Sequence, residues 1–336
     1  MELTVQQYLL ELIHKGFRMT FRRNAGVMKN GQFPVHSENE GGHSDEQEKI
    51  KKHLLDNKPG MLVRFGSIEL YAFINYLQVS GQMLDSAPYS AVRYIFDNCF
   101  PNWFSIGSRN GMLCNAGFFP SDADNLRRWG ELVLNDLKEI DVLFTWQEAE
   151  RYIRRYIPKR TEYILNSEMY WPYFFHNPWY RALEGKKVLI VSPFAETIKK
   201  QYKKRLQLFP GGGISLPEFE MKVIKAYNVL QGVNTYESIS SWFDALDDMK
   251  CQMESIDYDV ALLGCGAYAF NLAAHAKRMG KKGMTVCGSL QTLFGIYGRR
   301  YEAEFRKRGI INENWVKPDA DERPAGYKKV EKGAYW

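Results

Sequence analysis

The stretch that decides the fold is Asp259-Val-Ala-Leu-Leu-Gly-Cys-Gly-Ala-Tyr-Ala-Phe-Asn-Leu-Ala-Ala-His-Ala-Lys-Arg-Met-Gly-Lys-Lys-Gly-Met-Thr-Val-Cys-Gly288. An apolar run at 260–263 leads into a turn with two glycines, Gly264 and Gly266. A helical pattern follows over 268–279, and a second apolar strand over 283–287. We predict a βαβ unit whose first turn brings backbone N–H groups against a phosphate at a helix N-terminus.

Two cofactor interpretations of this turn are weakened by the residues that follow it. A dinucleotide site has a third glycine in the turn and an acid about twenty residues later. Here Phe270 and Asn271 occupy the third-glycine region, and the second strand runs into Cys287, Gly288 and Ser289 without a carboxylate. Methyltransferases also usually place an acid at the end of that strand. A dehydrogenase or methyltransferase therefore stays open only as a lesser alternative.

Strands and helices alternate along much of the chain, which favours a largely parallel, Rossmann-like α/β sheet covered by helices on both faces. Two further strand-turn-helix patterns lie at 61–77 and 187–202, and a helix followed by a strand is predicted over 122–144. In parallel sheets the turns after the strands gather at one edge, so we expect the turns at 64–69, 192–197 and 264–268 to line one cleft.

Three regions are expected along the 336 residues: an N-terminal helix over 1–23, a mobile loop over 24–46, and one α/β domain over 47–336 with a docked tail. The N-terminal helix is amphipathic with a basic end. Two interpretations stay open for it, packing against the domain and peripheral docking at a membrane.

Composition narrows the classes of function. The net charge of +6 is spread along the chain, without the concentrated basic surface of a nucleic-acid-binding protein, so no nucleic-acid partner is expected. The five cysteines form no Cys-x-x-Cys pair, which indicates reduced thiols and no structural zinc site. No signal peptide or membrane-spanning run is recognised, so we predict a cytoplasmic protein, at the inner face of the membrane if its N-terminal helix docks there.

The turn Arg64-Phe-Gly-Ser-Ile-Glu69 carries the first candidate active-site residues. Arg64 interrupts an apolar strand at its carboxyl end, which favours ligand contact. Glu69 falls in the first helical turn, where the helix dipole favours a negative charge by about 0.3–1 kcal/mol. Ser67 is a candidate N-cap.

This turn resembles the Arg-Phe-Gly-Asp-Gly-Glu turn of bacterial glycosyltransferases of the GT-D fold. The resemblance extends to the Ala-Gly-Phe-Phe-Pro segment at 116–120, to 259–288, to 291–296 and to Asn-Trp-Val-Lys-Pro at 314–318. It implies transfer of a sugar from a nucleotide-diphosphate sugar to a hydroxyl of a glycan or lipid-linked glycan acceptor in surface polysaccharide biosynthesis. A non-catalytic nucleotide-sugar or glycan-binding protein on the same scaffold is the alternative.

The resemblance implies catalytic roles for Glu69 and Arg64, and a Mn²⁺ or Mg²⁺ cofactor bound through Glu69 and the donor diphosphate. Ser67 stands where the family has Asp, and a hydroxyl is a poorer ligand for such cations than a carboxylate. Metal binding is therefore expected to be weak or dispensable, with Arg64 supplying positive charge to the leaving diphosphate.

The remaining candidates are placed at the turns or beside them. Donor-binding positions are predicted at Gly66, Ser67, Asn115, Gly117, Ser192, Gly264, Gly266, Tyr268 and Gly288. His176 is a candidate general base in an aromatic loop, with a structural or exposed role as the stronger interpretation. Lysines 199, 200, 203 and 204 and Arg205 are interpreted as a solvated helix face from which one side chain could reach a phosphate.

Overall fold

The structure is a computed structural model that describes residues 4–7, 9–12, 45–82, 103–209, 214–230, 232–324, 326–330 and 332–336. Within these residues the chain forms one open sheet of seven strands, all parallel. The strands are β1 (Gly60–Val63), β2 (Val142–Thr145), β3 (Glu162–Leu165), β4 (Lys187–Ser192), β5 (Glu220–Lys225), β6 (Val260–Leu263) and β7 (Lys282–Thr285). Their order across the sheet is β3-β2-β1-β7-β6-β4-β5.

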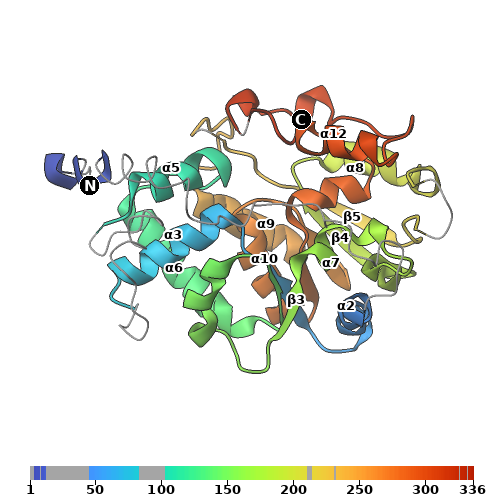
Figure 1. Ribbon diagram of the computed structural model, residues 1–336, viewed down its shortest axis with the longest axis horizontal. Coiled ribbons are helices and arrows are strands. Elements are labelled where there is room, and N and C mark those ends of the chain that lie inside the picture. The colour runs from blue at the N-terminus through green and yellow to red at the C-terminus, as the bar shows by residue number, and fades with distance from the viewer. Residues whose placement is uncertain are drawn as a thin grey trace.

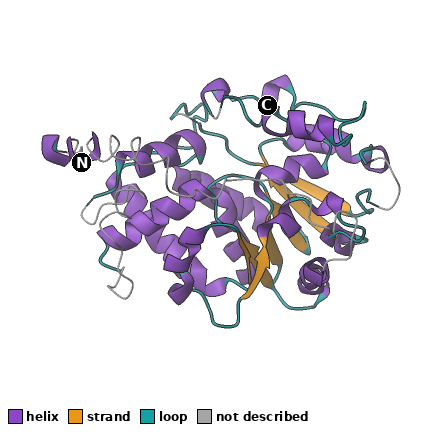
Figure 2. Ribbon diagram, viewed as in Figure 1, coloured by secondary structure: helices purple, strands orange, loops and turns teal. Residues whose placement is uncertain are grey.

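Helices cover both faces of this sheet (Figures 1 and 2). They are α2 (Asp45–Leu55), α3 (Ser67–Val79), α5 (Ile106–Asn115), α6 (Ala123–Asp136), α7 (Asn166–Tyr170), α8 (Ala195–Tyr202), α9 (Trp242–Glu254), α10 (Tyr268–Arg278), α11 (Leu290–Leu293) and α12 (Arg299–Lys307). The predicted α/β architecture is therefore confirmed, with a sheet that is parallel throughout.

Successive residues of the central strands alternate between two apolar cores, as expected for strands buried on both faces. In β4, Leu189 and Val191 face the core formed with α3, α6, α9 and α10. Val188 and Ile190 face the opposite core, formed with α2, α7, α8, α11 and α12. Most of the abundant aromatic side chains are buried in these cores, where they bring large apolar surface out of water.

The chain changes direction across the sheet between β4 and β6. After β4 it crosses by α8, on the face of the second core, to the outer strand β5. After β6 it crosses by α10, on the opposite face, to β7. The loops after β4 and β6 therefore diverge and leave a crevice at the carboxyl edge, which is where open α/β sheets bind ligands.

The βαβ unit at 259–288 forms nearly as predicted. The strand β6 and the start of α10 match the expectation, but β7 begins at Lys282 and ends at Thr285, before Cys287. Cys287 instead has a φ of 54°, which a strand does not allow. At Gly283 an added Cβ would lie 2.5 Å from the Cα of Ala273, so this glycine allows α10 to pack closely on β7.

The N-terminal expectations are only partly covered by the described residues. Residues 5–7 and 9–12 are helical, and the rest of the expected helix lies outside the described part. The predicted loop over 24–46 also lies outside it, except for its last two residues, which begin α2. Glu11 is buried and accepts hydrogen bonds from the Nε1 of Trp103 at 3.0 Å and the N–H of Ile106 at 2.9 Å.

That contact leaves apolar side chains of the N-terminal helix exposed: Val5, Leu9, Leu10 and Leu12. Membrane docking of this helix stays a prediction. Within the described residues, no helix has the length and apolar character needed to cross a bilayer.

Candidate functional site

One cleft at the carboxyl edge of the sheet brings the predicted residues together. All of those named at the turns line it: Arg64, Gly66, Ser67, Glu69, Asn115, Gly117, Ser192, Gly264, Gly266, Tyr268 and Gly288. The turns after β1, β4 and β6 thus converge as expected. The cleft also has lining residues that sequence reasoning did not single out: Trp146, Tyr170, Tyr227, Asn228, Arg300, Tyr335 and Trp336.

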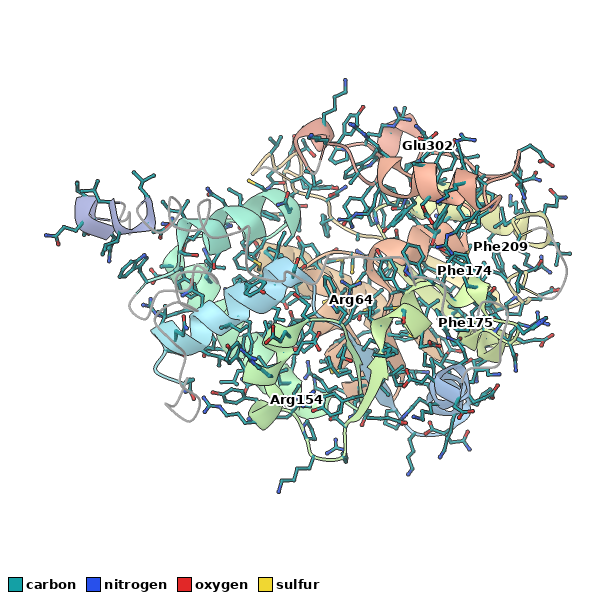
Figure 3. All side chains as sticks on the ribbon, in the orientation of Figure 1. Arg64, Arg154, Phe174, Phe175, Phe209 and Glu302 are labelled. Carbon is teal, nitrogen blue, oxygen red and sulfur yellow. The ribbon has the colours of Figure 1, made fainter. Side chains whose placement is uncertain are left out.

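Arg64 is held in one orientation by two aromatic rings. Its guanidinium carbon lies 4.6 Å from the ring centre of Trp146 and 5.2 Å from that of Tyr170. Its backbone N–H donates to the Oγ1 of Thr285 at 2.8 Å, which ties the end of β1 to the end of β7. Cation–π contacts of this kind contribute about 0.5–2 kcal/mol each. Figure 3 shows Arg64 near the centre of the molecule, with Arg154 and Glu302 toward its lower and upper parts.

Both rings are themselves anchored. The Nε1 of Trp146 donates to the carbonyl of Phe65 at 2.9 Å, directly after Arg64 in the chain. The hydroxyl of Tyr170 hydrogen-bonds to that of Tyr301 at 2.6 Å. The arginine is therefore preorganised, so little side-chain entropy remains to be lost when an anion binds. Sequence reasoning missed this arrangement because its parts come from β1, β2, α7 and α12.

Glu150 fixes the loop that carries Trp146. Its buried carboxylate oxygen Oε1 accepts hydrogen bonds from the N–H groups of Trp146 at 3.2 Å and Gln147 at 3.3 Å. Burial raises the pKa of Glu150 to about 7, against the opposing effects of these N–H groups and of the Arg64 charge. Glu150 does not line the cleft, so it positions the loop from behind.

The raised pKa of Glu150 predicts a pH dependence of stability. A carboxyl whose pKa is raised on folding stabilises the protein while protonated, and this stability is lost as pH rises from about 4.5 through about 7. The loss is on the order of 3 kcal/mol. Glu150→Gln keeps an acceptor oxygen but does not ionise, so the variant is expected to lose less stability than wild type between pH 5 and 8.

Urea unfolding at pH 5 and pH 8 measures this difference. Glu148→Gln is the matched control, because Glu148 lies in the same short 3₁₀ helix (Glu148–Tyr152) but is exposed and paired with Arg151 at 2.6 Å. An equal pH-dependent loss of stability in wild type and Glu150→Gln would contradict the assignment.

Glu69 lies in the first turn of α3, with its carboxylate folded back over Gly66. An added Cβ at Gly66 would lie 2.0 Å from the Oε2 of Glu69, so only glycine leaves room for the carboxylate there. The N-cap of α3 is Gly66 rather than the predicted Ser67, which is the first helical residue. Ser67 is half-buried, and its hydroxyl has no partner among the described residues.

The glycine turn after β6 lies against two neighbouring segments. Gly266 has a φ of 60°, and an added Cβ would lie 2.8 Å from the carbonyl oxygen of Ala116. At Gly264 an added Cβ would lie 2.9 Å from the carbonyl oxygen of Cys287. Among the described residues, no side chain caps the N-terminus of α10. The turn therefore leaves backbone at the cleft edge, as a phosphate-binding turn does.

Tyr268 and Gly288 line the cleft in less accessible places. Tyr268 is buried, its hydroxyl has no hydrogen-bond partner among the described residues, and burial raises its pKa. Gly288 lies under three tyrosines: an added Cβ would meet the hydroxyl of Tyr301 and the ring of Tyr335 at 2.9 Å each, and the hydroxyl of Tyr170 at 3.3 Å. Both residues shape the cleft more than they expose polar groups to it.

The charges of Arg64 and Glu69 both act on the thiol of Cys287, at the end of β7. Burial raises the pKa of this thiol, Arg64 lowers it and Glu69 raises it further. Both charged groups therefore lie within electrostatic reach of the end of β7. The four described cysteines are free, and Cys99 lies outside the described residues.

The turn after β4 differs from the expectation of a phosphate-binding turn. The carboxylate of Glu322 accepts hydrogen bonds from the N–H of Glu196 at 2.7 Å, from the N–H of Thr197 and from its hydroxyl, so the N-terminus of α8 already holds an anion. Ser192 is buried and its hydroxyl accepts from the N–H of Phe194 at 3.2 Å. Ser192 still lines the cleft, and its role in donor binding stays a prediction.

The segment after α12 closes one side of the cleft. The ring of Trp336 lies 6.0 Å from that of Phe194, and its Nε1 donates to the carbonyl of Glu322 at 3.2 Å. Arg300 donates to the hydroxyl of Tyr335 at 2.8 Å. This side of the cleft is aromatic, with one exposed arginine.

The remaining candidates do not enter the cleft. His176 is exposed and lies outside the lining, so the interpretation as an exposed residue holds. Lys199 and Lys200 pair with Glu196 at 2.7 Å and Asp319 at 2.5 Å, which accounts for their charges. The described residues include no group of three or more His, Cys, Asp or Glu side chains that could hold a metal ion.

Among the described residues, the cleft lining offers a divalent metal one carboxylate side chain, Glu69, close in sequence to the hydroxyl of Ser67. Hard cations of this kind are usually held by one or two carboxylates together with the phosphates of a substrate. These side chains alone therefore do not fit a protein-held metal site.

Comparisons with known proteins place the chain in no family. No family model matches it, and no curated protein matches it. A solved structure described as the selenomethionine-substituted structure of a domain of unknown function, DUF1792, is similar over 82% of this chain and 96% of that one. Its sequence identity is 11% and its TM-score 0.33, a likeness too low to assign a fold family or a function.

Proposed function

We propose that the protein is a glycosyltransferase that uses a nucleotide-diphosphate sugar. The observation that carries the proposal is the arrangement of Arg64, Glu69 and the Gly264–Gly266 turn around one cleft at the switch point of the sheet. A preorganised cation and a helix N-terminus that line the same cleft suit a diphosphate. The resemblance of the 64–69 turn to the GT-D glycosyltransferases points to the same chemistry.

In the proposed reaction a hydroxyl of a glycan or lipid-linked glycan acceptor attacks the anomeric carbon of the donor. The bond from that carbon to the diphosphate oxygen breaks, and the diphosphate leaves with the electron pair. Arg64 stabilises the charge that develops on the leaving group. Glu69 is the only carboxylate among the described residues that line the cleft, so it is the group proposed to bind the acceptor hydroxyl and take its proton.

We propose that any Mn²⁺ or Mg²⁺ is held mainly by the donor diphosphate, with Glu69 as the protein ligand. Such an ion would add positive charge at the leaving diphosphate. Arg64 supplies a fixed charge to the same groups in either case.

A non-catalytic binding protein on the same scaffold is the second candidate. The observation that favours it is Ser67 at the position of the family's aspartate. Binding of nucleotide sugars without transfer or hydrolysis, with acceptor glycans present, would support this candidate over the first.

A thermal-shift screen tests the proposal. The ligands are UDP, GDP and CDP, their hexose conjugates, CMP-linked sugars, NAD and S-adenosylmethionine, each with and without Mn²⁺. We expect stabilisation by at least one nucleoside diphosphate and its sugar conjugate, because a ligand that binds the folded state raises the melting temperature. Stabilisation by NAD or S-adenosylmethionine alone would refute the proposal.

A further inference from the structure

We infer that Asn115 and Asn228 form a subsite, here called the amide subsite, that binds the transferred sugar as an uncharged polyhydroxylated ring. This inference rests on the proposed function and specifies where in the cleft the sugar lies. Both asparagines line the cleft, as do Tyr335 and Trp336.

Three loops meet at the amide subsite. The N–H of Ala267, after β6, donates to the carbonyl of Ala116 at 3.0 Å. Gly117, with a φ of 75°, lies so close to the segment after β5 that an added Cβ would be 3.5 Å from the carbonyl oxygen of Val229. The end of α5, the loop after β5 and the loop after β6 are thus fixed against one another. Asn115 comes directly before Ala116 in the chain, and Asn228 comes directly before Val229.

The two side-chain amides are available to a ligand. Asn115 is exposed and Asn228 is half-buried, and neither side chain hydrogen-bonds to another described residue. The neighbouring Tyr227 is fixed, because its hydroxyl donates to Asp248 at 2.8 Å and its ring packs against Tyr236 at 4.8 Å. A rigid ring next in the chain to one of two amides that have no partner among the described residues gives a sugar both an apolar surface and hydrogen-bonding groups.

The charges of the cleft indicate an uncharged ligand for this subsite. Among the described lining residues, the charged side chains are Arg64, Glu69 and Arg300. Arg300 bonds to Tyr335 on the aromatic side, and Arg64 stacks between Trp146 and Tyr170. Among the described lining residues, no cation is therefore left at the amide subsite to pair with a carboxylate on a sugar. A side-chain amide both donates and accepts hydrogen bonds, and so do sugar hydroxyls.

The two sides of the cleft suit the two ends of a nucleotide sugar differently. With the diphosphate at Arg64 and the α10 N-terminus, one end of the donor extends toward the aromatic side and the other toward the amide subsite. A flat nucleobase matches the aromatic side, whereas a polyhydroxylated ring matches the amides. The helix that carries Glu69 packs against α5, which ends at Asn115. An added Cβ at Gly111 of α5 would lie 3.1 Å from the side chain of Ile68.

Calorimetric titration of wild type, Asn115→Ala and Asn228→Ala tests the inference. Each protein is titrated with UDP, UDP-glucose, GDP and GDP-mannose. We expect each substitution to weaken the nucleotide sugar about 3- to 10-fold while the Kd of the matching bare diphosphate stays unchanged, since each removes neutral hydrogen bonds to the sugar alone. Asn177→Ala is the control: Asn177 is exposed, bonds to Glu48 at 3.1 Å and lies outside the cleft.

The outcomes separate this inference from the proposed function. If wild type binds no nucleotide, the proposed function fails and the amide subsite fails with it. Two results with a wild type that binds a nucleotide sugar would refute the amide subsite alone. In the first, both variants bind the nucleotide sugar as tightly as wild type does. In the second, each variant loses as much affinity for the bare nucleoside diphosphate as for the nucleotide sugar. Melting temperatures of the variants equal to that of wild type exclude loss of the fold as the cause.

Discussion

Arg64→Ala is expected to weaken the binding of a nucleoside diphosphate by about 10- to 150-fold, because hydrogen bonds to a charged group are worth about 1.5–3 kcal/mol. The guanidinium is held between Trp146 and Tyr170 before any ligand arrives. Its removal therefore takes away a fixed cation rather than a mobile one. Isothermal titration with the diphosphate that stabilises the wild-type protein measures the change.

Two further variants, Arg64→Lys and Arg128→Ala, test whether the loss of binding is specific to the guanidinium of Arg64. Lysine keeps the charge but lacks the planar group that stacks between two rings, so binding is expected to fall between wild type and Arg64→Ala. Arg128 also stacks on an aromatic ring, 3.8 Å from the ring centre of Phe243, but does not line the cleft. Arg128→Ala is expected to bind as wild type does. Unchanged binding in Arg64→Ala would remove Arg64 from the site.

Glu69→Gln is expected to lower the rate of sugar transfer by about 100- to 10,000-fold, the usual contribution of a general base. Glutamine has nearly the same shape, so the close contact over Gly66 is kept while the proton acceptor is lost. Binding of the nucleoside diphosphate is expected to stay within a few-fold of wild type. The effect is measured as the rate of donor turnover in the presence of acceptor glycan, detected by the release of nucleoside diphosphate.

Glu196→Gln is the matched control for this substitution. Glu196 also lies in the first turn of a helix that follows a parallel strand, but it pairs with Lys199 at 2.7 Å and does not line the cleft. Transfer rates that fall equally in both variants would show a general effect of removing a carboxylate from a helix terminus. Full activity of Glu69→Gln would exclude Glu69 as the base.

The sequence predicted the parts of the site that depend on which residues directly follow a strand. Gly264, Gly266 and Arg64 follow apolar strands, and parallel strands bring their carboxyl ends to one edge, so the convergence of their turns follows from the pattern. The same reasoning could not anticipate the end of β7, because the φ of 54° at Cys287 has no local signal in that segment.

Contacts between distant segments account for what the sequence did not reveal. Glu322 caps α8 from more than a hundred residues away, and it occupies the helix terminus that the pattern at 192–197 offered to a phosphate. Trp146 and Tyr170 stack on Arg64 although each follows or belongs to a different element. In the sequence, either aromatic residue alone is typical of a buried core position. Such contacts depend on the completed tertiary packing, which periodicity and spacing do not encode.

A crystal structure of the protein with a nucleoside diphosphate tests the central claim most directly. We expect the diphosphate to lie in the cleft, with its oxygens bonded to the guanidinium of Arg64 and to the backbone N–H of Gly266 in the turn after β6, because the N–H of Gly264 already donates to the carbonyl of Val191 at 2.9 Å. A ligand bound elsewhere, with the cleft between Arg64 and that turn empty at saturating concentration, would contradict it.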